Sequence, residues 1–103
     1  MAYRYLVFAK RAALLGVCLM DIERSTSISE SEMQTITYIS FDKESTDGID
    51  IVELSSAQIT ERETQKALGK MPAYSGGSIN YTTTDAAWKT AMQAEYPDMF
   101  SPV

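Results

Sequence analysis

The segment Tyr3–Ala9 has the sequence YRYLVFA and is rich in aromatic and branched side chains. This composition is typical of a β-strand. Its apolar character is nearly continuous rather than alternating, as in strands that are covered on both faces. We therefore expect residues 3–9 to form an inner strand, and we place the other elements of the chain around it.

The segment Lys10–Arg24 is expected to follow this strand as a buried helix. Leu14, Val17, Cys18 and Ile22 have the spacing i, i+3, i+4 and i+8, which places them on one face of a helix. The basic pair and apolar run at its start are similar to a secretory signal, but no small-residue cleavage site follows promptly. The run is also about half the ~20 residues needed to cross a bilayer. We expect neither a targeting segment nor a membrane segment here.

The segment Met33–Phe41, MQTITYISF, is dense in Thr, Ile and aromatic residues and is predicted to be a strand. A charged turn at Asp42–Gly48 connects it to Ile49–Leu54, which is expected to pair back on it as a hairpin. Ile36 and Tyr38 would lie on one face of the first strand, with further apolar residues on the other. Such a hairpin is expected to offer apolar surface for strand addition or for a sheet-mediated dimer.

A second helix is predicted from Ser55 to Leu68. Ser55 and Gln58 have the spacing of a capping box, and Gly69 is the residue type that most often follows a helix C-terminus. Residues 70–78 contain a proline and a Gly-Gly pair, so they are expected to form a loop.

A short strand at Ile79–Thr83 and a last helix complete the expected elements. The last helix begins near Thr84 or Asp85, both good N-caps, and ends before Pro97. The tail at residues 96–103 is unusually apolar for a chain end and is expected to dock on its own domain or on a neighbour.

These elements predict a single domain spanning residues 1–103. The expected fold class is α+β: a small two-layer domain with a three- or four-stranded mixed sheet and helices mainly on one face. The predicted element order is β-α-β-β-α-(β)-α.

The charge of the chain disfavours a polyanionic partner. The 103 residues contain 14 Asp and Glu against 9 Lys and Arg, a formal net charge of −5. The largest basic cluster is the pair at residues 10–11, whereas nucleic-acid binding needs clustered Lys and Arg. We expect no direct nucleic-acid contact. Cys18 is the single cysteine, so no internal disulfide forms, which favours a reducing, cytoplasmic location.

No motif for catalysis, a cofactor or a metal is present in the sequence. Histidine, the commonest general base and metal ligand, is absent. If Gly48 is set at position six of a calcium loop, Lys43 falls on the first ligand position and Leu54 on the last. The Gly-Lys pair at residues 69–70 is followed by Met71 rather than by the Ser or Thr of a phosphate loop. We predict no enzyme activity, cofactor or metal.

The candidate partner-binding residues are apolar or aromatic side chains, the types enriched at the centres of protein interfaces. They come from the predicted hairpin, the last helix and the tail: Ile36, Tyr38, Trp88, Met92, Tyr96, Met99 and Phe100. The spacing of Trp88 and Met92 also fits a helix face that is directed into the core.

We therefore expect a non-enzymatic protein–protein interaction protein, a small acidic subunit or adaptor of a larger assembly. A structural component encoded by a virus is one example of such a subunit. The partner is another protein or a second copy in a homo-oligomer. Two alternatives remain open. One is an acidic inhibitor that occupies a basic groove of a target protein, and the other is a regulatory α+β domain that binds a small molecule.

Overall fold

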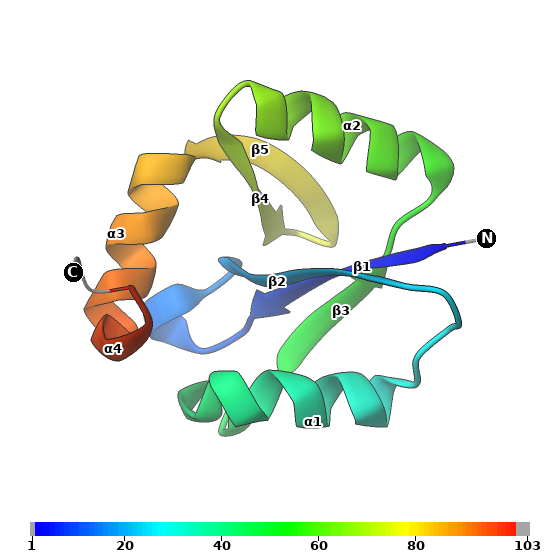
Figure 1. The fold of residues 1–103 in the computed structure, drawn as a ribbon. Helices are drawn as coiled ribbons and strands as arrows, with labels where there is room; N and C mark the ends of the chain where they lie inside the picture. Colours follow the sequence, from blue (N-terminus) through cyan, green and yellow to red (C-terminus); the bar gives the residue numbers. More distant parts are fainter. Residues whose placement is uncertain (1, 101–103) are drawn as a thin grey trace.

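The structure, a computed structural model, describes residues 2–100, with the side chain of residue 100 excluded (Figure 1). The predicted α+β class is confirmed, but both sheets are antiparallel rather than mixed. The elements in chain order are β1 (Tyr3–Ala9), η1 (Ala12–Leu14), β2 (Cys18–Arg24), α1 (Glu30–Ser40), η2 (Asp42–Ser45), β3 (Ile49–Glu53), α2 (Ser56–Ala67), β4 (Lys70–Ser75), β5 (Ser78–Thr84), α3 (Asp85–Glu95) and α4 (Pro97–Phe100).

Strand β1 is the middle strand of the larger sheet, whose order is β2-β1-β3. It pairs antiparallel with both neighbours, with Tyr3 opposite Arg24 of β2 and Ala9 opposite Ile49 of β3. Residues 5–9 are all buried, so the expectation of an inner strand is confirmed. Successive side chains of a strand point to opposite faces, and both faces of β1 are covered within one chain.

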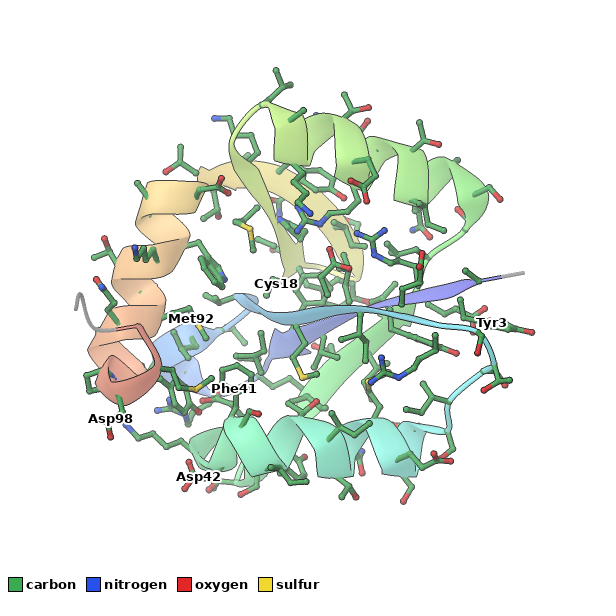
Figure 2. All side chains as sticks on the ribbon, in the orientation of Figure 1. Tyr3, Cys18, Phe41, Asp42, Met92 and Asp98 are labelled. Atoms are coloured by element: carbon green, nitrogen blue, oxygen red, sulfur yellow. The ribbon has the colours of Figure 1, made fainter. Side chains whose placement is uncertain are left out.

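The first face of this sheet is covered by α1, and α3 lies across the end of the sheet, against η1 and the β4–β5 hairpin (Figure 1). Tyr5 and Val7 of β1 pack there in one cluster with Met33 of α1 and Met92 of α3. Figure 2 shows Met92 and Phe41 directed into the space between these helices and the sheet. Helix α1 and the second half of α3 therefore bury their apolar side chains in one cluster with this face of the sheet, and this cluster is the larger part of the core.

The second face is covered by α2 and the β4–β5 hairpin (Figure 1). Phe8 of β1 stacks on Tyr74 of β4, with ring centroids 5.2 Å apart. The Tyr74 amide also donates to the carbonyl of Gly16, at 2.9 Å. Gly16 has a φ of +78°, and a Cβ there would collide with the Tyr74 carbonyl. Glycine is therefore required where the hairpin meets the β1–β2 connection.

The helix predicted over Lys10–Arg24 is wrong. That segment is the short turn η1 followed by strand β2, which forms a hairpin with β1. The positive φ of Gly16 interrupts the segment in its middle, which an α-helix does not tolerate. Residues 17–22 are apolar enough to be buried in either state, so their spacing alone did not distinguish a helix from a strand.

The strand predicted over Met33–Phe41 is also wrong, because this segment belongs to helix α1. Ser29 caps the helix through a hydrogen bond from the Glu32 amide. Met33 and Thr37, four residues apart, are buried on one face, and the Thr37 hydroxyl donates to the Met33 carbonyl at 2.8 Å. The predicted hairpin of residues 33–54, with its excess apolar surface, therefore does not exist.

The second half of the chain was predicted more accurately. Ser55 and Gln58 form both hydrogen bonds of the capping box, and Gly69 follows α2 with a φ of +74°. Strand β5 and helix α3, capped by Thr84, lie where they were expected. The loop predicted at residues 70–78 is wrong, since it contains strand β4 and the tight turn to β5.

Candidate functional site

Strand β3 lies at one edge of the larger sheet, and among residues 2–100 β1 is its single neighbour. The amide of Leu54 donates to the Arg4 carbonyl at 2.8 Å, which sets the phase of the hydrogen-bonded ladder. Hydrogen bonding alternates along an antiparallel strand. Ile49, Ile51 and Glu53 therefore direct their N–H and C=O groups away from β1, toward the open edge.

Hollows adjoin this edge on both faces of the sheet. The hollow on the α1 side has a volume of about 330 Å³ and is lined by β3 together with Tyr5 and Ile28. On the opposite side, a hollow of about 310 Å³ lies between β3, α2 and the aromatic rings of Tyr74 and Tyr81. A third, of about 330 Å³, lies between β3, Leu15 and the β4–β5 turn. An added strand would thus find space for alternate side chains on both faces.

The side chains around the open edge are acidic. Glu30 and Glu53 line the hollow on the α1 side, Glu61 lines a hollow on the α2 side, and Asp50 lines a hollow on each side. None of these four carboxylates forms an ion pair within residues 2–100. No Lys or Arg lines any of the three hollows. The described part of this edge therefore carries negative charge without a countercharge.

Asp21 of β2 has the opposite environment. It accepts hydrogen bonds from Arg4 Nη2 at 2.9 Å and from Arg62 Nε at 2.7 Å, and Arg4 also pairs with Glu63. Burial opposes ionisation of Asp21, but the two guanidinium groups outweigh it and hold its pKa below the usual value. This network fixes α2 on the sheet, so its charges are structural.

A second buried network closes the other end of the molecule. Glu44 is fully buried, and its Oε2 accepts hydrogen bonds from Arg11 and from the Tyr96 hydroxyl. Burial, and then the bond to Glu44, raise the pKa of Tyr96. Arg11 also pairs with Glu95, at 2.7 Å. Because Glu44 has no contact with solvent, it is not placed to exchange protons with a substrate.

The single thiol is not placed for chemistry either. Cys18 is buried, and this burial raises its pKa to about 12. The thiolate is the reactive form of cysteine, so this side chain behaves as a small apolar core residue.

The predicted partner-binding residues do not come together in one surface. Met92 and Tyr96 are buried in the core, and Trp88 is half-buried and donates its indole N–H to the Cys18 carbonyl at 2.7 Å. Ile36 and Tyr38 are half-buried on α1, where Tyr38 packs against the core. Met99 on α4 is 51% exposed. The side chain of Phe100 lies outside the described residues, as do residues 101–103 of the predicted tail.

The residues of the β3 edge were not identified as a candidate site from the sequence. A signal was present, since Ile49-Asp50-Ile51-Val52-Glu53 places acids among branched residues, a pattern typical of an edge strand. The misplaced hairpin assigned the exposed surface to residues 33–41 instead.

No family model, no curated protein and no solved structure matches this chain. Within residues 2–100, no helix has the length and apolar character needed to span a membrane. In the same range, no group of three His, Cys, Asp or Glu side chains is arranged to hold a metal ion.

Proposed function

We propose that this protein is a non-enzymatic protein–protein interaction protein, a small acidic subunit or adaptor, and that it binds its partner by strand addition at β3. The observation that carries this proposal is the outward-facing backbone of Ile49, Ile51 and Glu53 between hollows on both faces. In strand addition, main-chain hydrogen bonds provide affinity, and pockets for alternate side chains provide specificity.

The charge of the edge favours an extended partner segment that carries Lys or Arg. Asp50, Glu53, Glu30 and Glu61 surround the edge without a countercharge in the described chain. A cationic segment would supply it. A second copy paired through β3 would instead place Asp50 and Glu53 of both chains along one ladder, where like charges repel. The partner we propose is therefore a different, basic protein chain.

Two further observations support a non-enzymatic role and a reducing location. The buried states of Glu44 and Cys18 leave neither group available for catalysis. A buried, unpaired thiol also fits a reducing compartment, which supports a cytoplasmic location.

The experiment selects a displayed library of random linear peptides on the wild-type protein and compares binding to two variants. Glu53→Pro removes one outward-facing N–H without touching the ladder to β1, and Glu53→Thr removes the charge but keeps the donor. We expect enriched peptides to be rich in Lys, Arg and β-branched residues. Their affinity should fall at least about fivefold more with Glu53→Pro than with Glu53→Thr.

Amide hydrogen exchange locates the bound peptide. The amides of Ile51 and Glu53 face outward in the free protein, and they should become protected on binding, whereas Val52 and Leu54 already bond to β1. A selection that yields no binders, or binders that protect amides elsewhere, would contradict the proposal. Light scattering tests the alternative occupant. A dimer that forms in the wild type and is lost in Glu53→Pro would show that β3 pairs with a second copy of the chain, and it would contradict the basic partner.

A further inference from the structure

A separate cavity of about 300 Å³ lies where the end of α2, the start of β4 and the first turns of α3 meet. It shares no lining residue with the hollows beside β3. Its lining residues are Arg62, Lys66, Met71, Asp85, Trp88 and Lys89. The proposed strand addition does not use this cavity.

The charge of this cavity is opposite to that of the whole chain. Arg62 is paired with Asp21, which leaves two cationic side chains, Lys66 and Lys89, against one carboxylate, Asp85, although the chain carries a net charge of −5. Lys66 and Lys89 form no ion pair within residues 2–100. Cations in the other described networks are paired, as Arg4 and Arg11 are.

Arg62 is the one cation of this lining that is buried. It is 4% exposed, and its Nε is fixed by Asp21 at 2.7 Å. Its Nη1 is buried and has no hydrogen-bond partner. A buried donor without a partner is costly, and for a charged group the cost is larger. The atom has almost no accessible surface, so it is not exposed to a ligand in the cavity.

The uncharged wall of the cavity is apolar and aromatic. Trp88 and Met71 line it, and the bond from the Trp88 indole N–H to the Cys18 carbonyl holds the ring in place. Aromatic rings stack well on tryptophan, and thioethers also make favourable contacts with rings. The wall therefore suits a planar ring, while the two lysines suit a negatively charged substituent on it.

We propose that this cavity is a binding site for a small aromatic anion, a planar ring that carries a phosphate or carboxylate group. The ring packs against Trp88 and Met71, and the anionic group is held by Lys66 and Lys89. This site is independent of the β3 edge, so each proposal can fail without the other.

The test uses Trp88 as the reporter, because it is the single tryptophan of the chain. The wild-type protein is titrated with phenyl phosphate, benzoate, benzyl alcohol and inorganic phosphate, and binding is followed by tryptophan emission and by calorimetry. We expect saturable binding of an aromatic anion with a Kd of about 1 mM or tighter. Benzyl alcohol lacks the charge and inorganic phosphate lacks the ring, so both should bind at least about tenfold more weakly.

Variants of exposed residues locate the site without threatening the fold. Lys66→Gln and Lys89→Gln should each weaken binding of the aromatic anion by about threefold to tenfold. Lys43→Gln, which removes an equal charge far from the cavity, should leave it unchanged. Equal binding of benzyl alcohol, equal binding of inorganic phosphate, equal weakening by Lys43→Gln, or no saturation would each overturn the proposal. The relative affinities of phenyl phosphate and benzoate identify the preferred anionic group.

Discussion

The two outer strands of the larger sheet each carry an aspartate on the same face, and the two aspartates have opposite environments. Asp21 of β2 lies opposite Leu6 of β1, and Asp50 of β3 lies opposite Phe8, so both point toward the layer of α2 and the hairpin. Asp21 is held by two guanidinium groups, whereas Asp50 has no ionic partner among the described residues.

The backbones of the two strands differ in the same way. The start of β2 is closed by its own chain, through the bridge between Val17 and Ala73 and through the bond from Trp88 to the Cys18 carbonyl. The backbone of β3 has no such cover in residues 2–100. The chain thus covers the start of the β2 edge with its own hairpin and with Trp88, whereas no segment of residues 2–100 covers the backbone of β3.

Removing Asp21, the aspartate of β2, should have the largest effect on stability at neutral pH. Asp21→Ala leaves Arg4 and Arg62 without their shared carboxylate in a partly buried site, which we expect to lower the free energy of unfolding by about 3 kcal/mol. Chemical denaturation measures this change. A loss below about 0.5 kcal/mol would show that the network contributes little to holding α2.

The glycine beside the closed edge should be the next most sensitive position. Gly16→Ala forces a side chain into a backbone with φ of +78° and against the Tyr74 carbonyl, so we expect a loss of about 2 kcal/mol. Gly48→Ala is the matched control, because its φ is +82° but no atom lies within 4 Å of the added Cβ. Equal losses for both variants would mean that the contact with Tyr74 is unimportant.

The thiol near the closed edge predicts a dependence on alkaline pH. Burial raises the pKa of Cys18 from 9.0 to about 12, so the unfolded chain loses the thiol proton before the folded chain does. The contribution of Cys18 is complete below pH 9 and is lost as the pH rises toward 12, by up to about 1.4 kcal/mol per pH unit. Thermal unfolding against pH measures the slope. The stability of Cys18→Ala should fall less steeply with pH between 9 and 12. If its slope equals that of the wild type, the thiol is not the cause of the pH dependence.

A substitution on β3, at the open edge, should change stability least. Asp50→Asn removes a carboxylate that has no ionic partner in the described chain, so stability should change by less than about 0.5 kcal/mol in either direction. Chemical denaturation in the same buffer as for Asp21→Ala gives a direct comparison of the two edges. A loss similar to that of Asp21→Ala would mean that Asp50 is engaged within the folded chain, and it would remove support for an edge reserved for a partner.

The sequence was informative where one local rule acted alone. The continuous apolar run of Tyr3–Ala9 correctly indicated an inner strand, and Ser55, Gln58 and Gly69 correctly marked the limits of α2. These signals lie within a few neighbouring residues, so they do not depend on which distant segments pair.

The sequence was misleading where two periodicities fitted the same residues. Residues 33–41 have the β-branched and aromatic content of a strand, but Met33, Thr37 and Phe41 are also spaced by four, and tertiary packing selected the helix. The edge position of β3 follows from β1 pairing with β2 and β3 at once. No local pattern contains that information, so the candidate site could not be located before the topology was known.

The position of β1 at the centre of its sheet also has a consequence for synthesis. Tyr5 pairs with Glu53, 48 residues later in the chain. Strand β1 is therefore synthesised before β3, and one edge of β1 stays unpaired until translation has passed Glu53. Because contacts between distant residues form slowly, the nascent chain is most prone to misassociation during that interval, and a chaperone that recognises short apolar segments would have its target in Tyr3–Ala9.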